Sequence, residues 1–152
     1  MRISAKADYA VRALAELAAS GSDRPIKGET LANRQHIPLN FLENILRDLR
    51  RAGIVESRRG QAGGYVLARA ADAITVADVI RAVEGPLANV RGMSPETLDY
   101  SGSAEKLRDV WVALRAGVRS VLEGVTIADV ARGELPEHVE ELTRDEDAWA
   151  RR

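Results

Sequence analysis

Residues 38–67 combine a helix that is apolar on one side with a glycine-rich hairpin, and few folds contain that combination. The apolar positions of the helix recur three and four residues apart, which is helical spacing: Leu39, Leu42, Ile45, Leu46 and Leu49. Pro38 suits the first position of this helix, where a missing N–H costs nothing, and Gly53 suits its end. Two short β-prone runs, 54–58 and 65–67, flank a glycine-rich turn. We therefore expect a helix that leads directly into a β-hairpin.

Further helices are expected on both sides of this segment. Ser4 can cap a helix that reaches about residue 19, and a shorter helix covers residues 28–34, followed by a turn at residues 36–38. Helix, helix, turn, helix and hairpin is the element order of a winged helix-turn-helix. Capping boxes at 75–78 and 126–129 begin two short helices, and residues 104–122 form the longest helix. The sequence predicts a mainly α fold with a small β-hairpin wing (α+β), in which a winged helix-turn-helix domain precedes a long C-terminal dimerisation helix.

We expect the chain to be organised in three segments. Residues 1–70 are predicted to form the winged helix-turn-helix domain. Residues 71–132 are predicted to hold a linker helix, a long loop at 86–102 and the helix at 104–122. Residues 133–152 are predicted to be an acidic, flexible tail that is frayed after Pro136, although Val139, Leu142 and Trp149 could pack against the rest.

Charge is divided unevenly along the chain. Residues 1–70 carry 12 basic and 7 acidic side chains, a net charge of +5, whereas residues 71–152 carry 10 basic and 16 acidic ones, a net charge of −6. A basic front half joined to an acidic back half favours a polyanion-binding module attached to a part with another task. Chance variation in composition is the alternative.

The third helix presents polar side chains on the face away from its leucines. In a helix-turn-helix the first turns of this helix enter the major groove of DNA, where Asn reads adenine and Glu accepts from cytosine. We therefore predict base contacts from Asn40, Glu43 and Asn44, and phosphate contacts from the arginines further along, Arg47, Arg50 and Arg51. An ordinary solvated helix face is the alternative.

The hairpin adds a second basic feature. Arg58 and Arg59 lie next to Gly60 at the end of the first strand, and Tyr65 can anchor the base of the hairpin. The negative potential of the minor groove attracts arginine. The tip is therefore predicted to contact the minor groove, with a surface turn of incidental charge as the alternative.

Residues 104–122 carry a narrow apolar stripe whose members are spaced four, three, four and three residues apart. That spacing is typical of a coiled-coil seam. It predicts dimerisation through Leu107, Trp111, Leu114, Val118 and Val121.

Four segments of the chain together resemble the Rrf family of bacterial regulators. They are the stretch from Leu42 to Tyr65, the opening residues 1–14, the helix that closes on Val83-Glu84-Gly85-Pro86, and the Trp111 helix with the capping box beyond it. The resemblance spans roughly residues 1–132. It implies a homodimer of winged helix-turn-helix domains that crosses through the long helix and binds a pseudo-palindromic operator in double-stranded DNA. It also implies DNA contacts from the third helix (Asn40, Phe41, Glu43, Asn44), the wing (Arg58, Arg59, Gly60) and the start of the first helix (Arg2, Ser4, Tyr9). Pro38 departs from the small polar residue of some members, which argues against a base contact there.

Cluster-binding members of this family place cysteines in the loop after the Glu-Gly-Pro turn, but this chain has no cysteine. Asp8 lies where some members have an acidic ligand, yet one carboxylate without thiolates cannot hold an iron–sulfur cluster. His36 and His138 lack ligand-like spacing, so we expect no metal and no cofactor. We predict instead that the loop binds a small molecule at the dimer interface or docks a partner protein, through Asn89, Arg91, Met93, Asp99 and Tyr100.

The remaining classes of function fit poorly. No phosphate-binding glycine loop and no catalytic constellation is recognisable, so we do not expect an enzyme. No leader and no long apolar run is present, so we expect a cytoplasmic protein without a membrane partner. The prediction is a homodimeric, sequence-specific DNA-binding transcriptional regulator, a repressor, without an iron–sulfur cluster. The alternative is the same fold acting as a protein-interaction or small-molecule-responsive module with weak or lost DNA binding.

Overall fold

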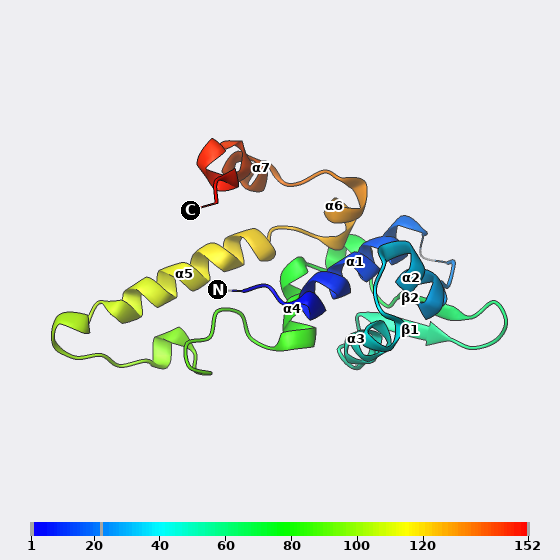
Figure 1. Cartoon of the computed structure of the whole chain (residues 1–152), viewed down its shortest axis with the longest axis horizontal. Helices are drawn as coiled ribbons and strands as arrows, with labels where there is room; N and C mark the ends of the chain where they lie inside the picture. Colours follow the sequence, from blue (N-terminus) through cyan, green and yellow to red (C-terminus); the bar gives the residue numbers. More distant parts are fainter. Residues whose placement is uncertain (1, 22, 152) are drawn as a thin grey trace.

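The computed structural model describes residues 2–21 and 23–151, and these form a mostly helical structure with one small hairpin (Figure 1). The helices and strands follow in the order α1 (Ala5–Ala19), α2 (Gly28–Gln35), α3 (Leu39–Arg51), β1 (Val55–Arg58), β2 (Gly64–Leu67), α4 (Val76–Glu84), α5 (Leu107–Leu122), α6 (Ile127–Arg132) and α7 (Glu137–Arg144). Short 3-10 turns lie at Ala71–Ala73, Pro95–Thr97, Gly102–Ala104 and Glu146–Trp149. The predicted fold class, mainly α with a β-hairpin wing, is confirmed.

Local side-chain chemistry explains most of the helix starts. The Ser4 hydroxyl accepts a hydrogen bond from the Ala7 amide at 3.0 Å and caps α1. Thr75 and Thr126 each form both halves of a capping box, as predicted, at the starts of α4 and α6. The sequence predicted Pro38 as the first helical residue of α3. In the structure Pro38 is the N-cap instead, because its ψ of 126° is extended and not helical.

The hairpin is antiparallel, with Val55 opposite Leu67 and Arg58 opposite Gly64. Its base is tied to the segment before α2, because the amides and carbonyls of Ile26 and Tyr65 exchange hydrogen bonds of 3.0 and 2.7 Å. Tyr65 thus anchors the base of the hairpin through its backbone amide and carbonyl. This attachment fixes the direction in which the hairpin leaves the helices.

One apolar core holds the helices around α1. It contains residues from α1, α2 and α3 and also Ile74, Val79, Ile80, Val83 and Ile127 from the following segment. A bridge between Thr75 and Thr126 ties the starts of α4 and α6 together. The predicted segments 1–70 and 71–132 therefore share one core, because α4 and α6 both pack against α1, and the division at residue 70 stays a prediction.

Helix α5 extends away from this core, and the connection between α4 and α5 runs beside the helix to its far end (Figure 1). The helix begins at Leu107, three residues later than the predicted start at 104, because residues 102–104 form a 3-10 turn. After Pro136 the chain forms α7 and buries Val139, one of the three tail residues expected to be able to pack, and the flexibility of the tail stays a prediction. The loop expected at 86–102 is present, and it is held by the buried side chains of Pro95 and Leu98.

Candidate nucleic-acid interface

Helix α3 is divided into an apolar and a polar face. Leu42, Ile45, Leu46 and Leu49 are buried, and the residues between them at the start of the helix are exposed: Asn40, Phe41, Glu43 and Asn44. Phe41 is a large apolar side chain with 43% of its surface exposed. The four predicted contact residues therefore share one accessible face over the first turns of α3.

One further predicted residue, Tyr9, joins this face through an aromatic pair. The rings of Tyr9 from α1 and Phe41 meet edge to face with centroids 5.7 Å apart. The Arg12 guanidinium lies over the Tyr9 ring at 5.3 Å and donates to the Gln35 side chain at 3.2 Å and to the Gln35 carbonyl. Arg12 also pairs with Asp8 at 3.1 Å. Asp8 is therefore a salt-bridged helix residue in this structure.

Sequence reasoning missed Arg12, although it lies four residues after Asp8 and three after Tyr9, and both intervals place side chains on one helix face. The three residues bring the first turns of α1 beside the start of α3. Arg12 thus positions Tyr9 next to the exposed face of α3.

The predicted phosphate-binding arginines continue the same polar face toward the end of α3, three, four or seven residues after Asn40, Glu43 and Asn44. Arg47 donates to the Asn44 side chain at 3.2 Å, and Asn44 donates to the Asn40 carbonyl at 3.1 Å. Arg50 donates to Ser57 of β1 at 3.2 Å, which links α3 to the hairpin. A hollow of about 400 Å³ lies between helix and hairpin, lined by Glu43, Leu46, Arg47, Arg50, Arg51 and Tyr65. The structure therefore gathers Arg47, Arg50 and Arg51 beside the base of the wing.

The wing tip is exposed. Arg58, Arg59 and Gly60 all lie in exposed positions, and Gly60 has a left-handed φ of +102°. The Gly63 amide closes the turn by donating to the Gly60 carbonyl at 3.0 Å. Both arginines are available to a partner outside the molecule.

One ion pair connects the first turn of α1 to α3. The Lys6 ammonium lies 2.7 Å from the Asp48 carboxylate, and both side chains are about one-third exposed or less. The hydrogen bond from Lys6 lowers the pKa of Asp48, with a smaller contribution from the nearby Arg51 and Arg47 charges. Asp48 is therefore ionised at neutral pH, and it reduces the positive charge beside the predicted DNA-facing side.

The remaining residues predicted near the start of α1 have different environments. Arg2 is exposed, whereas the Ser4 hydroxyl caps α1 and donates to the Glu84 carboxylate. Ser4 thus already serves the helix cap and an interhelical bond. A phosphate contact predicted for its side chain would have to compete with both.

The predicted dimerisation residues lie on α5 but differ in exposure. Leu114 is 43% exposed, and Leu107, Trp111, Val118 and Val121 are half-buried against their own chain. The indole of Trp111 donates to the Tyr100 hydroxyl at 3.1 Å. Tyr100, from the 86–102 loop predicted to bind an effector or a partner protein, is therefore tied to α5. The other four residues predicted in this loop are exposed: Asn89, Arg91, Met93 and Asp99.

The arrangement of α2, turn, α3 and hairpin, with one polar face across the start of α3 and the wing, defines a winged helix-turn-helix DNA-binding protein. A model of the Rrf2 family, described as iron-dependent transcriptional regulators, matches residues 3–133. The chain belongs to this family. It is 53% identical over 145 residues to Rv1287 of Mycobacterium tuberculosis, named as an HTH-type transcriptional regulator, with 95% of this chain and 90% of the relative covered.

Two further relatives, CymR and IscR, resemble this chain in structure. CymR of Bacillus subtilis, an HTH-type transcriptional regulator, is 37% identical over 131 residues, covering 86% of this chain and 90% of CymR. The structure described as CymR, the global cysteine regulator of B. subtilis, superposes with a TM-score of 0.74 at 34% identity, covering 87% of this chain and 97% of that one. The T. potens IscR structure covers all of this chain and 93% of its own, with a TM-score of 0.69 at 30% identity. These similarities indicate transcription regulation and point to no enzymatic family.

The family description mentions iron, so the donor set of this chain is relevant. The chain contains no cysteine, and the 86–102 loop carries amide, guanidinium, thioether, carboxylate and phenol groups instead. Within residues 2–21 and 23–151, no three His, Cys, Asp or Glu side chains gather in a way that could hold a metal ion. These residues do not fit a cysteine-held cluster.

No helix in the described part of the chain is both long and apolar enough to span a bilayer.

Proposed function

We propose that this protein is a homodimeric, sequence-specific DNA-binding repressor of transcription that works without an iron–sulfur cluster. The observation that carries the proposal is the shared face of α1, α3 and wing, where exposed amide, carboxylate, aromatic and guanidinium groups lie on rigid elements. Amide and carboxylate groups read base edges in the major groove, and guanidinium groups bind phosphates and the narrow minor groove.

Dimerisation is supported by the apolar surface of α5. Val110 and Leu114 are 53% and 43% exposed, and an apolar depression of about 390 Å³ is lined by Ile3, Leu114, Gly117, Val118, Val121 and Leu122. Contiguous apolar surface on a helix that projects from the core favours association with another molecule. A second copy that packs on this helix through a two-fold axis would place two α3 helices and two wings on one side of the dimer.

This geometry leads to an expectation for the operator. Two symmetry-related α3 helices require an inverted repeat whose half-sites are roughly one helical turn (~34 Å) apart or slightly more. Repression would follow if occupancy of such a site hinders the transcription machinery. Deletion of the gene should then raise, and not lower, transcription from promoters that contain the repeat.

The wing assignment is tested by salt dependence. Removal of both guanidiniums in the variant Arg58→Ala/Arg59→Ala should weaken DNA binding and reduce the slope of log K against log salt by roughly 2 to 4. The dimer loses up to four phosphate contacts, and each contact accounts for about 0.9 of the slope through counterion release. Fluorescence anisotropy with the DNA upstream of the protein's own gene, at several salt concentrations, measures both quantities.

The matched control is Arg108→Ala/Arg144→Ala, which removes the same charge from exposed positions on α5 and α7. The control should keep the wild-type salt slope. If the wing variant keeps it too, the wing does not contact DNA.

A further inference from the structure

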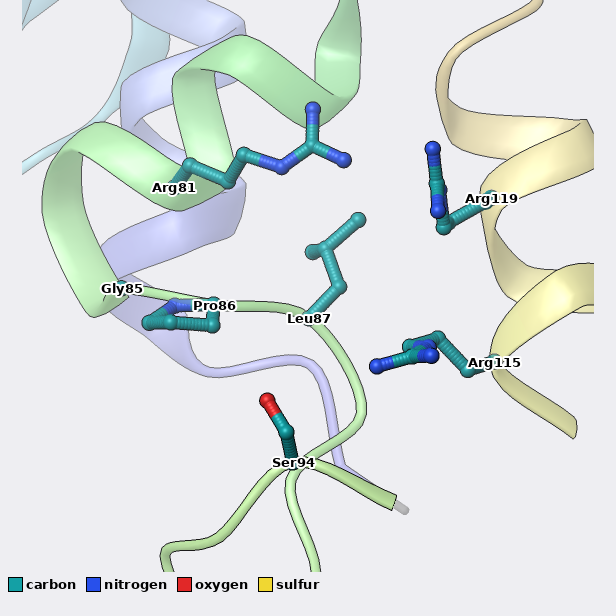
Figure 2. A pocket seen from close by; sticks show the side chains of 7 residues that line it. All are labelled: Arg81, Gly85, Pro86, Leu87, Ser94, Arg115 and Arg119. Carbon is teal, nitrogen blue, oxygen red and sulfur yellow. The ribbon is translucent and has the colours of Figure 1, made fainter. Parts of the chain in front are cut away.

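A concave site distinct from the DNA-facing side lies between α4 and α5 (Figure 2). Its volume is about 350 Å³, within the size range of sites for small ligands. It is lined by Arg81, Gly85, Pro86, Leu87, Ser94, Arg115 and Arg119. The site therefore contains three arginines and no acidic residue among its lining side chains.

The three guanidinium groups come from two helices. Arg81 extends from α4, Arg115 and Arg119 extend from α5, and all three reach toward the space around Leu87 (Figure 2). The Ser94 hydroxyl supplies a further hydrogen-bonding group from the loop below. Groups separated by more than thirty residues in sequence thus surround one cavity, and their common chemistry is donation to an anion.

Carboxylates outside the lining hold these arginines in place. Glu123 accepts from both Arg81 and Arg119, the latter at 2.9 Å, and Glu96 accepts from Arg115. The hydrogen bond from Arg81, followed by that from Arg119, keeps the pKa of Glu123 below its ordinary value, so that this carboxylate is charged at neutral pH.

These ion pairs leave donors unused. Each guanidinium carries five N–H donors in a planar fork, and one carboxylate occupies at most two of them well. Arg81 and Arg119 moreover share a single carboxylate oxygen, Oε1 of Glu123. Arg81 also lies 4.0 Å from the Asp78 carboxylate. Even so, the three guanidiniums carry more N–H donors than these carboxylates occupy, so the pairs orient the guanidiniums and leave donors unused.

We propose that this cavity, the α4–α5 arginine site, binds a small dianionic metabolite through phosphate, sulfate or carboxylate oxygens, and that this anion is the effector of the regulator. The inference rests on the proposed function, because an effector needs DNA binding to act upon. A guanidinium fork matches the two oxygens of such a group, and three forks match more than one charge.

The position of the site provides the coupling. Helix α4 packs against α1 in the core that carries the DNA-facing side, and α5 carries the apolar surface assigned to the dimer. An anion held between Arg81 on one side and Arg115 and Arg119 on the other fixes the angle between these helices. The angle sets the separation of the two α3 helices in a dimer, so an anion that prefers one angle shifts DNA affinity.

The experiment begins without DNA. The full-length protein is titrated with inorganic phosphate, sulfate and succinate by isothermal titration calorimetry, at an ionic strength kept constant with sodium chloride. We expect saturable binding of at least one of these anions. Arg115→Gln and Arg119→Gln should each weaken it about tenfold or more, since each removes a charge-assisted pair. The control Arg108→Gln, on an exposed part of α5 outside the site, should bind as the wild type does.

The second step adds DNA. The anion that binds should shift the midpoint of DNA binding for the wild type and for Arg108→Gln, but not for Arg115→Gln. The first step needs no DNA. If the protein binds the anion but no DNA, the anion site therefore still stands, and only the proposed function is contradicted. The proposal is overturned if none of the three anions binds saturably, or if both site variants, shown to be folded by circular dichroism, bind as tightly as the wild type. The arginines would then serve only to hold α5 to α4 and the loop.

Discussion

Lys6 and Asp48 illustrate how single residues connect the elements that would face DNA. Their ion pair joins the first turn of α1 to the last turn of α3. The edge-to-face contact of Tyr9 with Phe41 joins α1 to the start of α3, and Arg12 holds the Tyr9 ring by a cation–π contact. The Lys6–Asp48 and Tyr9–Phe41 contacts join residues more than thirty positions apart, whereas Arg12 and Tyr9 are three residues apart in α1. Individual side-chain contacts thus hold α1 beside α3, while the leucines of α3 provide its buried apolar surface.

The Lys6–Asp48 pair leads to a pH prediction. Because the folded-state pKa of Asp48 is lowered, its contribution to stability is present above the unfolded pKa and is lost as the pH falls through the folded value. Lys6→Met should lower the free energy of unfolding at pH 7 by about 0.5–1 kcal/mol, and by less near pH 3. Urea unfolding at both pH values measures the difference.

Lys106→Met is the control, because Lys106 and its partner Asp109 are 88% and 57% exposed and such pairs contribute little. An equal loss for Lys6→Met at pH 7 and pH 3 would show that the side-chain packing of Lys6 matters, and not its charge.

At the scale of elements, the wing depends on close backbone approach. Gly64 begins β2 with a φ of +147°, and a Cβ at this position would lie 2.5 Å from the backbone of Ile26. Only glycine allows β2 to lie against that segment. The hairpin is thus fixed at its base and exposed at its tip, which suits an element that has to reach a partner at a defined angle.

Gly64→Ala should therefore destabilise the protein by roughly 1–3 kcal/mol, because the new methyl group meets backbone that cannot move aside without breaking the Ile26–Tyr65 hydrogen bonds. Urea unfolding gives the free energy, and anisotropy gives the accompanying loss of DNA affinity. Gly21→Ala is the control, because Gly21 has a left-handed φ of +86° but open space around it. A loss for Gly64→Ala no larger than for Gly21→Ala would indicate conformational strain alone and no clash.

At the scale of the whole molecule, the features of α5 fall on two sides. One side carries Val110, Leu114, Val118 and Val121, and another carries Arg115 and Arg119 toward α4. The first side provides an apolar surface for a second copy, and the other provides the arginine site. A single helix thereby relates the proposed dimer contact to the proposed effector.

The dimer proposal is tested by a charge in the apolar surface. Leu114→Asp should convert the protein to a monomer in sedimentation velocity and weaken operator binding by at least about tenfold, since burial of an unpaired carboxylate is costly and the gain from two half-sites is lost. Ala116→Asp places the same charge elsewhere on α5, two residues along the helix, at an exposed position, and should remain dimeric. Dimers in both variants would show that association uses another surface.

Much of this structure follows from local patterns in the sequence. The leucine spacing of α3, the glycines of the hairpin and the two capping boxes predict their elements correctly, because helical periodicity, caps and turns depend on neighbours a few residues apart. The exposed faces of α3 and of the wing follow from the same periodicity. Errors at this level were small and lay at element ends, such as Pro38 and the start of α5, where competing turns differ little in energy.

Only the tertiary structure decided which distant residues meet. The sequence does not indicate that α4 and α6 share the core of α1, where their apolar faces pack. It left open whether Val139 of the tail packs, and α7 buries that side chain. Arg81, Arg115 and Arg119 look like ordinary surface charges in the sequence, and they surround one cavity only because α5 lies beside α4. Local spacing determines the elements and their faces, whereas the packing of those faces determines the sites that lie between elements.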